Sequence, residues 1–135
     1  MHRKYIWLFS LILLLTSCNK VTSYKYIYSG ESKNWDATFQ YEKIDNENNY
    51  ILTLSYIGDI NEISSSSEVT YSYIAGNKKG GGTLILNTSN HPLVIKDSGS
   101  TVNGTQLFEE DTILISVSWD DEYEEFELTI QNDTE

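Results

Sequence analysis

WDATFQYEK, residues 35–43, contains the alternation that decides the fold. Aromatic or apolar side chains occupy every second position of this stretch: Trp35, Ala37, Phe39 and Tyr41. Polar or charged side chains fill the positions between them. Because successive side chains of a β-strand point to opposite faces of its sheet, this period of two predicts a strand with one buried face.

The same period recurs along the chain. It is found in YKYIY (24–28), YILTLSYI (50–57), EVTYSYI (68–74), TILISVSW (112–119) and EFELTI (125–130). Turn-forming residues lie between these stretches, in DNENN (45–49), GD (58–59), GNKKGGG (76–82), NTSNHP (87–92) and DSGS (97–100). After the N-terminal region, no long window has helical periodicity. The pattern predicts an all-β fold with about eight or nine short antiparallel strands.

This strand count is typical of an antiparallel two-sheet sandwich, and we predict an immunoglobulin-like one. The disulfide of true immunoglobulin domains is absent, because Cys18 is the only cysteine in the chain. The prediction therefore depends on the number and spacing of the strands, and a small barrel is the alternative.

The N-terminus has the features of a secretory signal peptide. A short basic segment precedes an apolar run of eleven residues, Tyr5–Leu15, which only Ser10 interrupts. As a helix this run would rise about 16 Å, whereas the hydrocarbon core of a bilayer is about 30 Å thick. The run is therefore short for a membrane span and fits the apolar region of a signal peptide.

LTSC (15–18) follows directly and resembles the lipobox of bacterial lipoproteins, in which an aliphatic residue and two small ones precede a cysteine. The resemblance implies that Cys18 receives a diacylglyceryl group and that the chain is cut just before it. We expect three parts: a lipoprotein signal peptide (1–17), the lipidated Cys18 with a short tether (18–23), and a β-sandwich domain (24–135). Since two acyl chains anchor a protein stably, the lipid would hold it at the extracytoplasmic face of the cell membrane.

Two further stretches resemble those of a known group of proteins. YSGESKNW (28–35) is similar to a Gly-Glu-Ser-x-Asn-Trp motif of small, uncharacterised lipoproteins from Bacillus-like Firmicutes, and ISVSWDDEYEEFEL (115–128) resembles their final hairpin. The resemblance implies a location and a fold but no activity. In structural terms, Gly30 permits a turn or bulge, and Trp35 begins the next strand as a core residue.

The charge balance excludes two classes of partner. Removal of the signal peptide leaves 7 basic and 20 acidic residues, so that the formal charge changes from −11 to −13. Nucleic-acid binding depends on clustered Lys and Arg, so no nucleic-acid partner is expected. Adsorption to anionic lipid also requires basic patches, so the covalent lipid has to provide the membrane contact.

Candidate catalytic groups are few, and we expect neither an enzyme nor a bound cofactor. His91 is the only histidine after cleavage, and lipid modification consumes the only cysteine. GNKKGGGT (76–83) has Gly82 where a phosphate-binding loop needs its lysine, and no helix pattern follows it. A flexible hairpin loop is the better interpretation of this stretch.

Acidic residues are concentrated near the C-terminus. From Glu109 to Glu135 the chain has eleven carboxylates and no lysine or arginine. Asp120, Asp121 and Glu122 are candidate binding residues, because carboxylates on a loop are suitable oxygen ligands for Ca²⁺. Their spacing does not match an EF-hand loop, and a solvated surface explains them as well, so no metal site is predicted.

Aromatic residues are the last candidate signal. Trp35 and the tyrosines of YKYIY could stack on sugar rings or form a protein interface, or they could line the core. The leading hypothesis is a membrane-tethered interaction module that binds another cell-surface protein. The alternative is a carbohydrate or wall-polymer binding domain, which should expose Trp or Tyr rings. An enzyme would require His91 beside a carboxylate in a cleft.

Overall fold

The computed structural model describes residues 23–64, 67–86, 93–104 and 106–131. It contains eight strands and one turn of 3-10 helix, Ile60–Glu62. The strands are β1 (Ser23–Glu31), β2 (Trp35–Ile44), β3 (Glu47–Tyr56), β4 (Glu68–Ala75), β5 (Lys78–Ile85), β6 (Val94–Val102), β7 (Ile113–Trp119) and β8 (Glu122–Ile130). The predicted all-β, antiparallel fold is confirmed.

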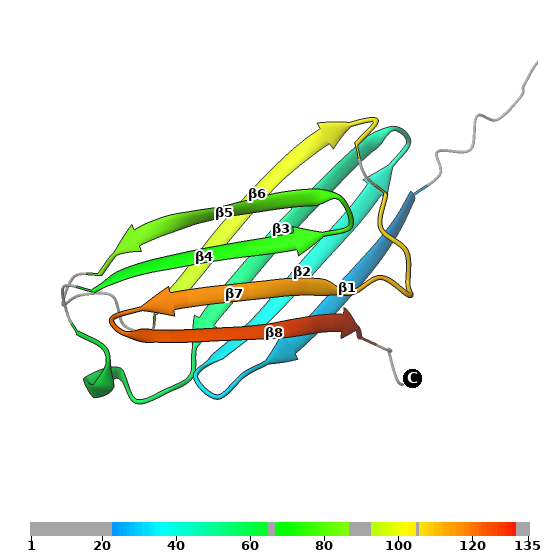
Figure 1. Ribbon diagram of the computed structural model, residues 1–135. Helices are drawn as coiled ribbons and strands as arrows, with labels where there is room; N and C mark the ends of the chain where they lie inside the picture. Colours follow the sequence, from blue (N-terminus) through cyan, green and yellow to red (C-terminus); the bar gives the residue numbers. More distant parts are fainter. Residues whose placement is uncertain (1–22, 65–66, 87–92, 105, 132–135) are drawn as a thin grey trace, which may run out of the picture.

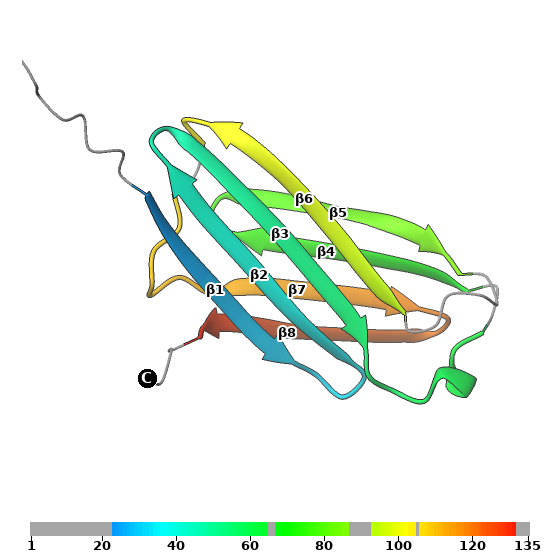
Figure 2. The same cartoon turned by 180° about the vertical axis from the view of Figure 1, so that it is seen from behind.

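All eight strands belong to one antiparallel sheet with the order β5-β4-β7-β8-β1-β2-β3-β6. The sheet folds over, so that β5-β4-β7-β8 faces β1-β2-β3-β6 (Figures 1 and 2). These two halves are joined by β8 and β1, which share only two residue pairs, Tyr28 with Ile130 and Ser29 with Thr129. The result is close to a barrel, with β5 and β6 as its two edges.

The two separate sheets of the predicted immunoglobulin-like sandwich are therefore not confirmed. The physical reason is that strands twist, and a twisted sheet of this width can curl until its two halves face each other. The pair β8 and β1 then connects the two layers into a single sheet. The arrangement is nearer to the barrel alternative, although in the described part of the chain no backbone ladder joins β5 to β6.

The core lies between the two halves and follows the alternation of the sequence. Trp35, Ala37, Phe39 and Tyr41 are all buried, as their spacing predicts. The opposite half contributes buried side chains of the same period, including Val69, Tyr73, Ile113, Ile115, Val117 and Leu128. Burial of these apolar surfaces is the main source of stability, because a chain with a single cysteine cannot form an internal disulfide.

Three predicted turns are wrong in whole or in part. In DNENN (45–49) only Asp45 and Asn46 form the turn, because β3 begins at Glu47. Of GNKKGGG (76–82), only Gly76 and Asn77 form the turn, and Lys78 onward is strand β5. DSGS (97–100) lies inside β6. Glycine ordinarily weakens a strand, but tyrosine side chains from the neighbouring strands lie over these glycines and supply the missing contacts.

The predicted signal peptide, Cys18 and His91 lie outside the described residues. Within the described ranges, no helix has the length and apolar character that a membrane span requires.

Candidate functional site

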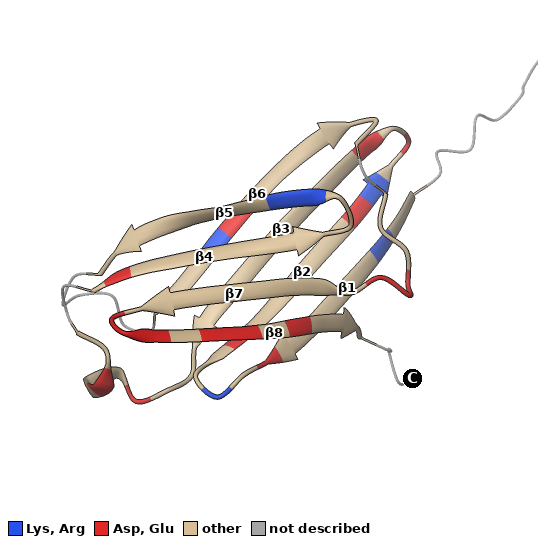
Figure 3. Ribbon diagram, in the orientation of Figure 1, with Lys and Arg blue, Asp and Glu red and all other residues tan. Residues whose placement is uncertain are grey.

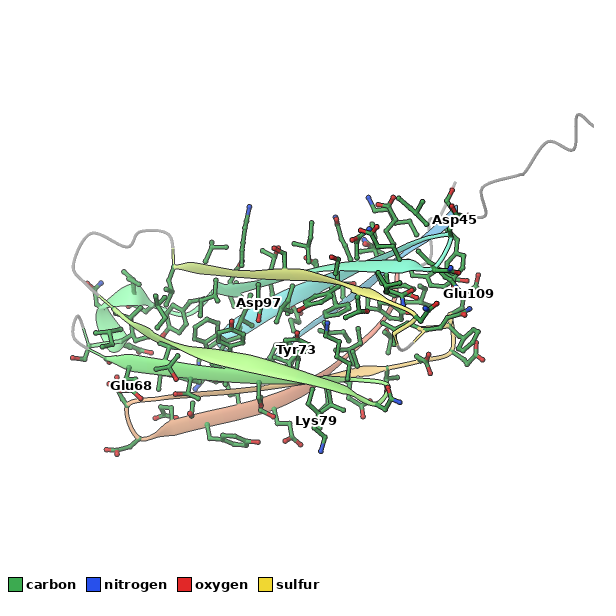
Figure 4. The ribbon with its side chains drawn as sticks, turned by 90° about the horizontal axis from the view of Figure 1, so that it is seen from above. Asp45, Glu68, Tyr73, Lys79, Asp97 and Glu109 are labelled. Carbon is green, nitrogen blue, oxygen red and sulfur yellow. The ribbon has the colours of Figure 1, made fainter. Side chains whose placement is uncertain are left out.

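The most unusual feature of the described structure is its open side, where the edge strands β5 and β6 lie near each other without backbone pairing. We call this region the seam and define it by β5, β6 and the tyrosines that lie over them, Tyr50, Tyr71 and Tyr73. Figure 4 looks onto this side of the molecule, with Tyr73 and Asp97 between the two layers. Side chains rather than a backbone ladder therefore close the seam.

Each of the three tyrosines lies over a glycine that is its partner in the register. Tyr73 is paired with Gly80, Tyr71 with Gly82, and Tyr50 with Gly99. A Cβ atom added at Gly80 would overlap the ring of Tyr73, and one at Gly99 would lie 2.5 Å from the hydroxyl oxygen of Tyr50. The rings therefore occupy the space of a side chain at Gly80 and Gly99, whereas at Gly82 the nearest atom, the Tyr71 hydroxyl oxygen, lies 3.0 Å away.

Two contacts cross the seam in opposite directions. The Nζ atom of Lys78 in β5 lies 3.3 Å from the ring centroid of Tyr50 in β3. The hydroxyl of Tyr71 in β4 donates a hydrogen bond of 3.0 Å to Oδ2 of Asp97 in β6. Each edge strand therefore carries a charge whose tyrosine partner belongs to the other half. Inward charges on an edge strand also prevent unselective pairing.

The environment of the seam changes the acidity of Tyr71. Burial, followed by the hydrogen bond to Asp97 and the charge of that carboxylate, raises the pKa of Tyr71 to about 12. Its phenol therefore stays protonated, and remains a hydrogen-bond donor, at neutral pH. The rings of Tyr50 and Tyr73 lie in the same seam, and their centroids are 6.1 Å from each other.

A small cavity lies at the end of the seam next to Lys78. Its volume is about 20 Å³, which is room for a single water molecule but not for a sugar or a nucleotide. The hydroxyl of Tyr41 donates to Oδ1 of Asn48 in its wall at 2.7 Å. The wall consists of Phe39, Tyr41, Asn48, Tyr50, Ala75, Lys78, Thr101 and Leu107.

A second feature joins the two stretches on which the lipoprotein resemblance depends. Glu124 of β8 accepts hydrogen bonds from the Ser32 hydroxyl at 2.6 Å, the Asn34 backbone N–H at 2.8 Å and the Asn34 side-chain amide at 2.8 Å. Burial would raise the pKa of Glu124, but these bonds and nearby Lys33 together lower it below its ordinary value. The carboxylate thus fixes the turn between β1 and β2.

Trp35, a predicted binding residue, lies in the core. Its exposed fraction is 0%, and its ring meets Trp119 and Tyr56 edge-on at centroid distances of 5.6 and 5.2 Å. It therefore has no surface on which a ligand could stack. The indole Nε1 is buried without a hydrogen-bond partner.

Asp120, Asp121 and Glu122 lie together at the β7–β8 hairpin because they are consecutive. Asp120 adopts a left-handed conformation with φ of 47° and accepts hydrogen bonds from the Ser67 hydroxyl and from the backbone N–H of Ser64. Asp121 and Glu122 are exposed. Among the residues with described positions, no three Asp, Glu, His or Cys side chains form a group that could hold a metal ion.

Sequence reasoning missed the residues of the seam and also Glu124. The signal for the seam was the pairing of a tyrosine-rich strand with a glycine-rich one, which is visible only once the register is known. Comparisons with protein-family models, curated proteins and solved structures give no match for this chain. The function therefore has to be argued from the seam.

Proposed function

We propose that the protein is a lipoprotein at the extracytoplasmic face of a bacterial cell membrane, and that its β-domain is a protein-interaction module without catalytic activity. The observation that carries the proposal is the pair of edge strands on the open side. Unpaired backbone groups on an edge are a template for pairing with another chain. Because its two layers face each other, we also propose that the fold is related to the immunoglobulin-like sandwich.

The anchor is the second part of the proposal. The lipobox-like LTSC (15–18) and the apolar run before it support lipidation at Cys18. The domain is acidic overall, so electrostatic attraction to anionic lipid is not expected and the covalent lipid alone has to provide the attachment. Acidic residues predominate along β8, whereas β5 carries two lysines and no acid (Figure 3). A partner protein at the cell surface is thus the class of ligand that we propose.

Exposed apolar residues at the ends of both edge strands add to the argument. Ile85 of β5 is 69% exposed, and Val102 of β6 is 70% exposed. Exposed side chains of this size are common when isolated, but here each one lies next to unpaired backbone. A partner strand would cover the backbone and the apolar side chain together.

Carbohydrate or wall-polymer binding has less support. Stacking on sugars needs exposed aromatic rings near one another, and Trp35 and Trp119 are both buried. Phe108 and Tyr123 are exposed, but the segment between β6 and β7 and the start of β8 lie at opposite ends of the molecule (Figure 1).

The test is chemical crosslinking on intact cells, followed by capture of the lipidated protein and mass spectrometry. Ile85→Glu places a charge on the β5 edge, while Ile57→Glu changes a half-exposed isoleucine that follows β3 and belongs to neither edge strand. We expect the wild type and Ile57→Glu to yield the same crosslinked protein and Ile85→Glu to lose it. Absence of any crosslinked protein, or equal yields from all three, would overturn the proposal.

A further inference from the structure

The two edge strands share a sequence pattern that is self-complementary. In β5 the pattern is Lys79, Gly82 and Ile85, and in β6 it is Lys96, Gly99 and Val102, with the same spacing of three residues. In each strand a tyrosine lies over the central glycine. In each strand, too, a glutamate of the neighbouring strand is paired with the exposed apolar residue, Glu68 with Ile85 and Glu47 with Val102.

From this pattern we infer that the partner is a second copy of the chain, which pairs with the open side to form a symmetric dimer. The inference rests on the proposed function and names the partner at the same site. In such a dimer β5 pairs antiparallel with β5 of the other copy, and β6 pairs with β6. Both layers of the molecule then continue across the interface.

The register follows from the faces of the strands. Lys79, Gly81, Thr83 and Ile85 face outward, and the residues between them face inward. Residues directly opposite each other in an antiparallel pair point to the same face, so odd-numbered residues must oppose odd-numbered ones. A two-fold axis through Gly82 satisfies this rule and places Lys79 opposite Ile85 of the second copy.

Charge selects this register over its neighbours. In the second copy, Ile85 is paired with Glu68 of β4. The backbones of Lys79 and this Glu68 are then two strand spacings apart, about 10 Å, and the two long side chains can bridge that gap together. An axis through Gly81 would instead place Lys79 opposite Thr83, whose partner in β4 is the uncharged Thr70. Figure 4 shows Lys79 and Glu68 toward opposite ends of the β4–β5 hairpin, as a two-fold pairing requires.

The β6 edge repeats the arrangement. An axis through Gly99 places Lys96 opposite Val102 of the second copy, with Glu47 beyond it. Across the seam the two central glycines are offset by two residues, or about 7 Å of strand, because Tyr71 covers Gly82 and donates its hydroxyl to Asp97, two residues before Gly99. The β5 ladder therefore sets the two-fold axis, and the β6 strands of the two copies approach each other beside it, where the crossing of β5 and β6 has to take up the offset for a second ladder to form.

This symmetry is compatible with two lipid anchors in one membrane. The axis runs perpendicular to the layers, so Ser23 of the two copies lies at the same height along it. Confinement to a membrane also raises the effective concentration of the copies, which favours an interface made of two short ladders.

The test uses the lipidated full-length protein on cells. Since lipid modification uses the only cysteine, Thr83→Cys introduces a single thiol near the axis, and Thr129→Cys places one on the outer face of β8 as a control. We expect a short bis-maleimide to produce a crosslinked dimer of Thr83→Cys and none of Thr129→Cys. A monomeric Thr83→Cys, or equal crosslinking of both variants, would overturn the inference.

A charge exchange in the Thr83→Cys background tests the register. Lys79→Glu or Glu68→Lys alone should lower the crosslinked fraction about tenfold, since two ion pairs become two repulsions, and the double variant should restore it. No restoration would overturn the register. If the wild type captures a different protein while Thr83→Cys stays monomeric, the interaction module stands and self-pairing fails; if nothing is captured, both fail.

Discussion

Glu124 makes three hydrogen bonds to a turn that lies about ninety residues earlier in the chain. Replacement by Gln keeps the size of the side chain but removes the charge that all three donors share. We expect Glu124→Gln to lower the free energy of unfolding by about 2 kcal/mol, because hydrogen bonds to a charged group are stronger than neutral ones and solvent weakens them at a half-buried site. Urea unfolding at pH 7 measures the change, with the exposed Glu127→Gln as control.

The pH dependence of that difference follows from the lowered pKa of Glu124. A carboxylate whose pKa is lower in the folded state stabilises the fold above the unfolded pKa of about 4.3, and this contribution is lost as the pH falls through the folded pKa. The gap between wild type and Glu124→Gln should therefore be full at pH 6 to 7 and shrink below about pH 4. A gap that stays constant down to pH 3 would contradict this assignment.

Single residues also mark how far sequence reasoning reaches. The burial of Trp35 could be predicted, because the alternation around it is local. Its role as a binding residue could not be excluded, because the same ring could lie on either face of a strand. Glu124 could not be recognised, since four glutamates of β8 are equivalent in sequence and only the fold brings one of them to Ser32 and Asn34.

At the scale of elements, β5 depends on glycine where tyrosine rings cover it. Gly80→Ala would place a methyl group in the ring of Tyr73, which is buried against Phe39 and Tyr50. At Gly82 the nearest atom is the Tyr71 hydroxyl oxygen at 3.0 Å. We expect Gly80→Ala to cost about 2–3 kcal/mol of unfolding free energy and Gly82→Ala clearly less, since overpacking costs more where neighbours cannot move. Parallel urea titrations of the two variants compare the costs. Equal costs would mean that Tyr73 moves as freely as Tyr71.

The hydrogen bond between Tyr71 and Asp97 connects the elements on either side of the seam. Tyr71→Phe should lower the free energy of unfolding by about 1 kcal/mol and speed hydrogen exchange of amides in β5 and β6 more than in β7. Because its pKa is raised to about 12, Tyr71 stabilises the fold fully below about pH 10, and this contribution is lost as the pH rises toward 12. The difference from Tyr71→Phe should therefore disappear in that range.

Exchange rates that rise equally in all strands would show that the bond stabilises the whole sheet rather than the seam.

The glycine content of β5 explains why the sequence predicts a loop at this strand. Local composition favours a turn at 76–82, and the tyrosines that stabilise a strand there come from β4, so the stabilising contact is not local. The same reason applies to DSGS (97–100), which Tyr50 of β3 covers in part.

For the whole molecule, periodicity predicts six of the eight strands and their antiparallel pairing, but neither the edge strands β5 and β6 nor the joining of the halves. The contact between β1 and β8 links the two ends of the domain through two residue pairs, and no local pattern encodes such a distant neighbour. Because β1 and β8 join the two halves on one side, the edge strands β5 and β6 meet on the other side and form the open side, which is the candidate site. Sequence therefore predicts the layers and not the seam.

The remaining prediction concerns the attachment of the whole molecule. Cys18→Ser removes the only thiol that can carry the lipid, so incorporation of labelled fatty acid should fall to background and the protein should leave the membrane fraction. Thr16→Ala keeps a small residue at that lipobox position and should retain the label. If self-pairing depends on confinement to the membrane, Cys18→Ser should also reduce dimer crosslinking through Thr83→Cys, because released copies lose their high effective concentration. Continued labelling of Cys18→Ser would show that the anchor lies elsewhere, whereas full release with unchanged crosslinking would show that the two ladders hold the dimer without the membrane.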